Sequence, residues 1–136
     1  MKFYIASRFK NIDQVRNLSA KLHSKGFIQT YDWTQNERAA SYEALQQIGQ
    51  AEKQAVANSD FLVILLPAGK GSHIEFGIAL GLGKRIYIYA REKEYFDFNE
   101  TSTFYHADGV QRFAGEFEDF VRYLVEREMR RIQAEI

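Results

Sequence analysis

Two glutamates, Glu52 and Glu75, are the residues whose type and position are best suited to chemistry in this chain. Glu75 follows the stretch Pro67–Ser72, a glycine-rich loop between an apolar run and a helical pattern. Glycine lets the backbone approach a ligand closely, and the free N–H groups at a helix start favour an anion. A carboxylate beside such a loop can act as a nucleophile or as an acid–base group.

Spacing alone leaves a second interpretation of Glu75 open. Ser72 stands three residues earlier, which is the spacing of a capping box, where the two side chains satisfy backbone N–H groups at the helix start. This arrangement needs no catalytic role. The loop is neither a P-loop nor a dinucleotide-binding motif, because Lys70 precedes the second glycine and no Gly-Lys-Ser or Gly-Lys-Thr follows.

Glu52 lies within the apolar stripe of a helix predicted over residues 39–58. It stands four residues from both Ile48 and Val56, so the three side chains share one helix face. A buried carboxylate needs a partner or a function, because burial of an unpaired charge is costly. Glu52 therefore either pairs with a basic residue such as Arg8 or faces a ligand crevice. The complete stripe is Leu45, Ile48, Ala55 and Val56.

The elements that position these residues alternate between strand-like and helical patterns. The first helix is predicted to start at Asn11, with Gln14 as its capping-box partner, and to end at Gly26. The segment 127–136, REMRRIQAEI, is predicted to be a solvated helical end. The predicted strands are residues 2–6, 27–33, 60–66, 85–90 and 103–106, and the later helices are residues 39–58, 73–83 and one from near Arg112.

Alternating strands and helices of these lengths predict an α/β fold with a parallel sheet and right-handed crossovers. We predict one domain over residues 1–136, a flavodoxin-like three-layer sandwich with a five-stranded parallel sheet in the order 2-1-3-4-5. Ligands of such sheets bind outside the carboxyl ends of the strands. This rule indicates residues 6–9, 31–33, 66–75 and the segment after residue 90 as the surroundings of a ligand.

Composition excludes several classes of function. The formal net charge is zero, from 18 basic and 18 acidic residues, so there is no general positive field for a nucleic-acid polymer. The absence of cysteine excludes thiolate catalysis and disulfides. The three histidines lack the spacing of metal ligands, so we predict no metal and no cofactor. The sequence has neither a signal-like start nor a membrane-length apolar run, so a cytoplasmic location without a membrane partner is expected.

Residues 59–89, SDFLVILLPAGKGSHIEFGIALGLGKRIYIY, resemble the nucleoside 2-deoxyribosyltransferase family, which includes relatives that hydrolyse nucleotide N-glycosidic bonds. The resemblance includes the opening KFYIAS and fades after about residue 90. The family's nucleophilic glutamate, on its E-x-G-x-A helix, falls on Glu75. Its helix acidic residue, eight before the aspartate of the central strand, falls on Glu52, and the tyrosine of its opening K-x-Y-x-A falls on Tyr4.

The resemblance implies cleavage or exchange of the N-glycosidic bond of a nucleoside or nucleotide through a covalent glycosyl-Glu75 intermediate. Tyr4 would hold the nucleophile, and Glu52 would protonate the leaving base or bind its edge. At the ligand end of the sheet, Ser7 and Arg8 could hold a 5′-phosphate together with Lys70 and Ser72, or the arginine and the lysine are ordinary surface residues. The expected substrate-binding residues are Ala6, Ser7, Arg8, Trp33, Pro67, Gly69, Lys70, Gly71 and Ser72; among them, Trp33 could stack on a base or simply pack.

The sequence departs from the family pattern at two positions. Gly69 stands where transferases often carry aspartate and nucleotide hydrolases carry serine, and Glu52 replaces the more usual aspartate. Transfer and hydrolysis therefore both stay open. In the family a neighbouring chain commonly completes the crevice, which implies a homodimer or larger homo-oligomer. Two alternatives remain: an NAD-type glycohydrolase, and a nucleotide-binding or sensing module that kept the fold without turnover.

Overall fold

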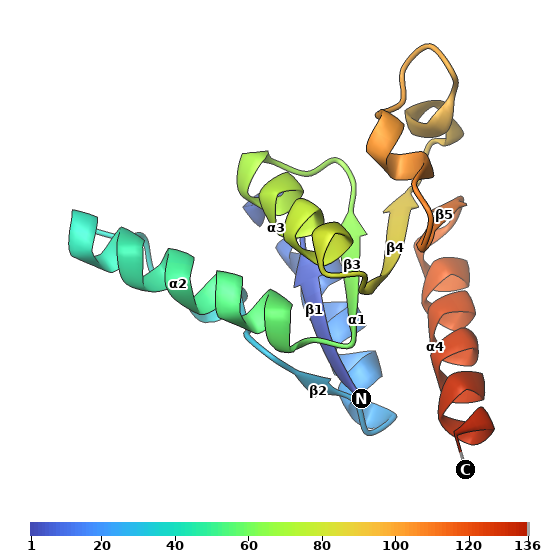
Figure 1. The fold of residues 1–136 in the computed structure, drawn as a ribbon, viewed down its shortest axis with the longest axis horizontal. Helices are drawn as coiled ribbons and strands as arrows, with labels where there is room; N and C mark the ends of the chain where they lie inside the picture. Colours follow the sequence, from blue (N-terminus) through green and yellow to red (C-terminus); the bar gives the residue numbers. More distant parts are fainter. Residues whose placement is uncertain (136) are drawn as a thin grey trace.

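In the computed structural model, residues 1–135 are described and fold into a five-stranded sheet with helices on both faces (Figure 1). The strand order is β2-β1-β3-β4-β5 and every neighbouring pair is parallel, so the predicted fold class and order are confirmed. The strands are β1 (Lys2–Ala6), β2 (Ile28–Gln29), β3 (Phe61–Leu65), β4 (Arg85–Ala90) and β5 (Val110–Ala114). The helices are α1 (Ile12–Ser24), α2 (Tyr42–Asn58), α3 (Lys70–Gly81) and α4 (Phe117–Ala134).

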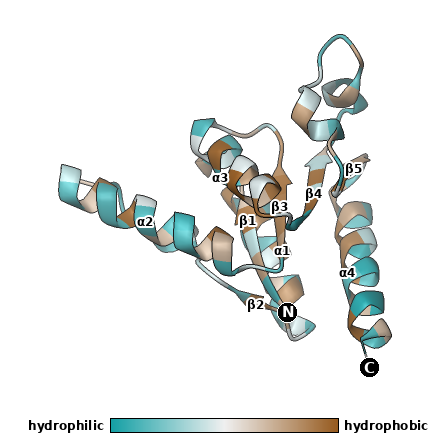
Figure 2. Cartoon of the chain, viewed as in Figure 1, coloured by the Kyte–Doolittle hydropathy of each residue, from teal (hydrophilic) through white to brown (hydrophobic). Residues whose placement is uncertain are grey.

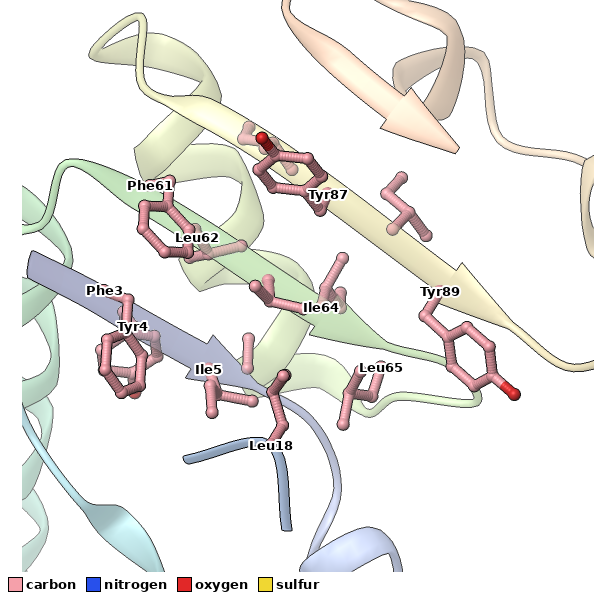
Figure 3. Close-up of a cluster of buried hydrophobic side chains, with 14 of the residues drawn as sticks. Phe3, Tyr4, Ile5, Leu18, Phe61, Leu62, Ile64, Leu65, Tyr87 and Tyr89 are labelled. Atoms are coloured by element: carbon pink, nitrogen blue, oxygen red, sulfur yellow. The ribbon is translucent and has the colours of Figure 1, made fainter. Parts of the chain in front are cut away.

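The core lies on both faces of the three central strands, β1, β3 and β4 (Figure 3). Every residue of β3 is buried, as expected for a central strand of a parallel sheet covered on both sides. Helices α2 and α3 pack against each other on one face, and α1 and α4 pack together on the other. Strand β3 is apolar along its whole length in Figure 2, whereas α2 and α4 carry many hydrophilic residues. No helix within residues 1–135 is long and apolar enough to cross a membrane.

The fifth strand does not lie where the sequence pattern placed it. Residues Thr103–His106 form a short 3-10 helix, whereas β5 is Val110–Ala114, and α4 begins at Phe117 rather than near Arg112. The strand is an edge strand with several exposed side chains, so it lacks the apolar run of a central strand. Glycines with positive φ stand on either side of it, Gly109 at 85° and Gly115 at 139°. Its pairing with β4, which only the fold reveals, defines it as a strand.

The helix starts also differ from the predictions. Helix α3 begins at Lys70 rather than residue 73, with Gly69 as its N-cap residue. The predicted capping box of α1 is absent, because the amide of Asn11 donates instead to the Ser7 Oγ (2.9 Å) and the Pro67 carbonyl (2.8 Å). The predicted end of α1 is confirmed at Gly26, whose φ is 91°.

Helix α2 is buried along only part of its predicted apolar stripe. Ala55 and Val56 are buried, as predicted, but Leu45 is exposed and Ile48 is only half-buried. The reason is visible in Figure 1, where the N-terminal half of α2 extends beyond the sheet edge. This half therefore has no core of its own chain to cover.

The C-terminal helix is not simply solvated at its end. Glu128 is fully buried and accepts two hydrogen bonds from Arg85, at 3.2 and 2.7 Å, and a third from the hydroxyl of Tyr87. Its spacing from Val121 and Val125 continues the buried face of α4, which explains why the carboxylate faces β4. A buried ion pair therefore joins α4 to β4 at the opposite end of the sheet from the glycine-rich loop.

Candidate active site

Tyr4, Glu52 and Glu75 meet at one point of the structure, although they are far apart in the sequence. The Tyr4 hydroxyl is hydrogen-bonded to the carboxyl of Glu75 and lies 3.1 Å from the Glu52 Oε2. Tyr4 is fully buried, Glu75 is 7% exposed, and Glu52 is half-buried. Tyr4 and Glu75 thus form the buried part of the cluster, and the carboxyl of Glu52 reaches towards solvent.

Local geometry explains why these three side chains converge. Side chains alternate between the two faces of a strand, so Phe3 points to α1, where its ring packs on His23, and Tyr4 points to α2 and α3. Glu75 lies in the second turn of α3, with Ser72 inside the helix rather than at its cap. The capping-box interpretation of Glu75 is therefore wrong, because the N-cap residue is Gly69 and the carboxyl is bonded to Tyr4.

An open cleft of about 600 Å³ lies above this cluster at the carboxyl end of the sheet. It lies beside β1 and β3, between which the strand order reverses and where open α/β sheets bind their ligands. Its walls come from the turn after β1, the segment before α2, the middle of α2 and the start of α3. The lining residues are Ser7, Arg8, Phe9, Trp33, Asn36, Glu37, Arg38, Glu52, Gly69, Gly71, Ser72 and Glu75.

Three predicted binding residues do not line this cleft. Ala6 is fully buried in β1. Pro67 lines a neighbouring depression beside Lys10 and Asn11, and Lys70 is exposed at the first position of α3. Lys70 is the first residue of α3, which begins earlier than predicted, and it is not among the lining residues of the cleft.

Ser7 lines the cleft, but its hydroxyl is already engaged. It donates to the carbonyl of Leu65 at 2.9 Å and accepts from the amide of Asn11 at 2.9 Å. A serine hydroxyl has one proton, so this one has no further proton to donate to a ligand in this arrangement. Ser7 thus ties the turn after β1 to the end of β3. The predicted partnership of Glu52 with Arg8 is likewise replaced, among the described residues, by the contact with Tyr4.

Sequence comparison identifies the family. The family described as nucleoside 2-deoxyribosyltransferase matches residues 3–128. The chain belongs to the nucleoside 2-deoxyribosyltransferase family. Among curated proteins, none matches this chain in sequence.

Two solved structures share the fold of this nucleoside 2-deoxyribosyltransferase family member. One is the CMP N-glycosidase BcmB from Clostridium botulinum, with 18% identity, a TM-score of 0.68, and coverage of 91% of this chain and 98% of that chain. The other is the 2-deoxyribosyltransferase from the psychrotolerant Bacillus psychrosaccharolyticus, with 17% identity, a TM-score of 0.68, and coverage of 89% and 90%. At these identities the likeness concerns the fold.

Four cleft residues of this family member were not among the predicted binding residues, although Phe9 lies in the range 6–9 that the strand ends indicated. Asn36, Glu37 and Arg38 lie in the irregular segment before α2, for which no periodic pattern exists. Phe9 is 58% exposed, and its ring packs at 5.9 Å on that of Trp33. Trp33 itself is 8% exposed and donates its indole N–H to the Ile5 carbonyl at 2.6 Å. The more accessible aromatic face in the cleft therefore belongs to Phe9. The sequence did contain a signal for Phe9, because an aromatic residue directly after the polar residues Ser7 and Arg8 can serve as a ligand contact.

The cluster around Tyr4 can hold a proton between its two carboxyl groups. Tyr4 has a single hydroxyl proton, so it can donate to one carboxylate while accepting from a protonated partner. Burial raises the pKa of Glu75, the adjacent Glu52 raises it further, and the hydrogen bond from Tyr4 offsets part of the effect, for a pKa of about 9. Burial and then the charge of Glu75 also raise the pKa of Tyr4, so its hydroxyl stays protonated.

A neutral isostere, Glu75→Gln, is expected to gain stability relative to the native chain as the pH rises from 4.5 to about 9. In this window the folded chain keeps a proton on Glu75 that the unfolded chain has lost, so its unfolding free energy falls with rising pH. Glutamine has no such proton, so the difference should grow by about 1–3 kcal/mol. Urea denaturation near pH 5, 7 and 9 measures it, with Glu94→Gln as the exposed control. A pH-independent difference would contradict the raised pKa.

No group of three potential metal ligands gathers anywhere in residues 1–135. What the site offers instead is a buried carboxyl, a second carboxyl facing the cleft, a hydroxyl between them, and Arg8 at the rim. This set is suited to nucleophilic and acid–base chemistry on a small polar ligand.

Proposed function

We propose that this family member cleaves or exchanges the N-glycosidic bond of a nucleoside or nucleotide, with Glu75 as the nucleophile. The observation that carries the proposal is the placement of Glu75: it is nearly buried, held by Tyr4, next to Glu52, and at the floor of the cleft. Two carboxyl groups at one site are the usual equipment for glycosidic bond cleavage with a covalent intermediate.

In the first step the proton of Glu75 passes by way of the Tyr4 hydroxyl to Glu52, and the ionised oxygen of Glu75 forms a bond to C1′ of the sugar as the C1′–N bond breaks. The electron pair of that bond leaves with the base, through an oxocarbenium-like transition state. Because Glu52 reaches the cleft and shares a proton with the cluster, it protonates the departing nitrogen as a general acid. Tyr4 donates to Glu75 and so fixes the direction of attack.

In the second step an acceptor attacks C1′ and releases the ester oxygen of Glu75. If the acceptor is water, Glu52, now ionised, takes its proton and the products are the free sugar or sugar phosphate and the base. If the acceptor is a second base, its ring nitrogen forms the bond to C1′, Glu52 takes the proton of that base, and the product is a new nucleoside or nucleotide. The open cleft of about 600 Å³ has room for either acceptor, water or a second base.

Substrate orientation is proposed to rest on three features of the cleft. The face of Phe9 offers a platform for the base. Gly69 and Gly71 let the sugar lie close to the backbone at the start of α3. Arg8 and the first turn of α3 offer positive charge and N–H donors to an anionic substituent such as a 5′-phosphate.

Arg8→Ala is expected to lower kcat/KM for nucleotides more than kcat/KM for the corresponding nucleosides. A charge-assisted contact to phosphate at a partly exposed site contributes about 1.5–3 kcal/mol, so kcat/KM for nucleotides should fall by about 10–100-fold. Nucleosides should change by less than about threefold. Steady-state base release from matched nucleoside and 5′-nucleotide pairs measures this, with Lys70→Ala as a control outside the cleft. An equal loss of kcat/KM for both substrates would contradict the proposal that Arg8 binds the 5′-phosphate.

The deciding experiment is incubation of the protein with nucleosides, deoxynucleosides, their 5′-monophosphates and NAD, each with and without a second base. Chromatography of free and exchanged bases separates hydrolysis from transfer. Release of nicotinamide from NAD alone would favour the NAD-type glycohydrolase. Binding without any turnover would favour the non-catalytic module and overturn the proposal.

We further propose a homodimer or larger homo-oligomer. The supporting observation is a set of large exposed apolar side chains on α2 and α3, including Tyr42 (91% exposed), Leu45 and Ile74. The projecting half of α2 has no partner from its own core (Figure 1). Light scattering on the same preparations measures the molar mass.

A further inference from the structure

His73 bridges the glycine-rich loop and a distant segment, residues 91–109, which rises beyond the carboxyl end of β4 (Figure 1). Its Nδ1 lies 2.9 Å from the carbonyl oxygen of Gly69, and its Nε2 lies 2.7 Å from the hydroxyl of Tyr105. The imidazole and phenol rings are stacked, with centroids 6.0 Å apart. Both nitrogens of this half-buried histidine are thus engaged, and the proposed reaction does not use them.

The chemistry of the partners defines the direction of both hydrogen bonds. A carbonyl oxygen can only accept, so Nδ1 carries the proton that is donated to Gly69. In the neutral ring Nε2 then has a lone pair and accepts from the hydroxyl of Tyr105. The second bond therefore stabilises the tautomer that the first one requires.

Tyr105 is a firm anchor for this pair. It is 8% exposed, and its ring packs edge-on against Phe76 and Phe96. Its backbone carbonyl accepts from Arg112 of β5 at 2.8 Å, which ties it to the sheet. His73 consequently connects the start of α3 to a side chain that is packed among aromatic rings and tied to β5.

The start of α3 needs such support. Its N-cap residue is Gly69, which has no side chain for a capping bond, and Gly71 follows within the first turn. Glycines are costly to order because of their backbone freedom. The carbonyl of Gly69 accepts from both the backbone N–H of His73, at 3.2 Å, and its imidazole. Without the imidazole, the Gly69 carbonyl would accept from the backbone N–H of His73 alone.

We propose that His73 is a positioning residue that, through Gly69 and Tyr105, holds the Gly69–Ser72 edge of the cleft in its substrate-binding conformation. This inference rests on the proposed function, in which that edge contacts the sugar or its phosphate. Glu75 is held independently by Tyr4, so the contribution of His73 falls on binding rather than on the chemical step.

The kinetic test uses His73→Leu, His73→Asn and Tyr105→Phe in the full chain, with the substrate turned over fastest in the panel. His73→Leu loses the hydrogen bond that orders the Gly69–Ser72 edge of the cleft. Its KM should therefore rise about 3–10-fold, while kcat stays within about threefold. Asparagine places an N–H donor where Nδ1 lies, so His73→Asn should recover most of the KM. Tyr105→Phe keeps the ring packing but loses the hydroxyl, and should raise KM by a smaller factor.

Controls separate this role from a structural one and from the proposed function itself. His106→Leu, on the 91–109 segment but outside the cleft, should leave KM unchanged. Nitrogen-15 shifts of the His73 ring should report the neutral Nδ1–H tautomer. The backbone amide of residue 73 should exchange faster in His73→Leu than in the native chain, and neither measurement needs turnover. A lowered Tm with unchanged KM, or an Nε2–H tautomer, would overturn the inference. Absence of turnover in the native chain would instead refute the proposed reaction.

Discussion

Replacement of Glu75 by glutamine is expected to reduce base release by at least about 10³-fold while the fold is retained. Glutamine matches glutamate in size but cannot supply an ionised oxygen to C1′. The fold should survive because Tyr4 can still donate to the amide oxygen at this buried position. The measurement is single-turnover and steady-state release of base, with circular dichroism as the check on folding.

The matched control for this prediction is Glu37→Gln. Glu37 lines the same cleft but is exposed and lies in the segment before α2, away from the Tyr4 cluster. A fall in activity of less than about threefold is expected there. Retention of full turnover in Glu75→Gln would rule out the nucleophilic role. An equal loss in both variants would show that the charge of the cleft, rather than a specific nucleophile, accounts for activity.

Mass spectrometry adds a direct test of the covalent step. Rapid acid quenching of the native chain during turnover should trap a glycosyl group on the peptide that contains Glu75. Glu75→Gln should give no adduct on that peptide. An adduct elsewhere would mean that the cluster has been assigned the wrong nucleophile, because Tyr4 and Glu52 are the other groups within reach.

The parts of the fold that sequence predicted well are those where one periodicity dominates. Strands β1 and β4 have the bounds expected from the runs KFYIA and RIYIYA, because buried parallel strands are almost uniformly apolar. The contact of Tyr4 with Glu75 was implied by the family resemblance, and the structure shows it. It agrees with the alternation of side chains along a strand and with the position of ligand sites in open sheets.

The parts that sequence did not predict depend on contacts between distant segments. Strand β5 is defined by its pairing with β4, and residues 103–106, which suggested a strand, form a 3-10 helix. Helix α3 begins three residues earlier than predicted, because Gly69 can serve as the N-cap residue without a side-chain hydrogen bond. Arg38 lines the cleft but belongs to an irregular segment, whose conformation cannot be predicted from a local sequence pattern.

Glu128 is the most instructive miss, since its sequence context is dominated by charge. The segment from residue 127 has three arginines, and such a segment is usually solvated. Yet Val121, Val125 and Glu128 are spaced by four and three residues, which continues the buried face of α4. The signal was therefore present, but only the position of Arg85 on β4 shows why a carboxylate is tolerated there.

Glu128→Ala is expected to lower the unfolding free energy by about 3 kcal/mol, because it leaves Arg85 and the hydroxyl of Tyr87 without their acceptor. The value lies at the low end for a buried pair, since the Arg85 side chain is 26% exposed and can reach water. Native domains have only about 5–15 kcal/mol of stability, so this loss is large. Urea denaturation measures it, with Glu126→Ala on the same helix, exposed, as a control expected to cost less than about 0.5 kcal/mol.

The double variant Arg85→Met with Glu128→Leu separates the cost of an unpaired charge from the value of the pair. Removal of both charges avoids the desolvation penalty, so it should recover at least half of the stability lost in Glu128→Ala. A double variant as unstable as the single one would mean that the pair, rather than the orphaned charge, is what stabilises α4 on the sheet. Because the pair lies at the opposite end of the sheet from the cleft, base release by the refolded double variant should match that of the native chain. A specific loss of turnover would instead indicate that the packing of α4 on β4 is coupled to the site on the other face.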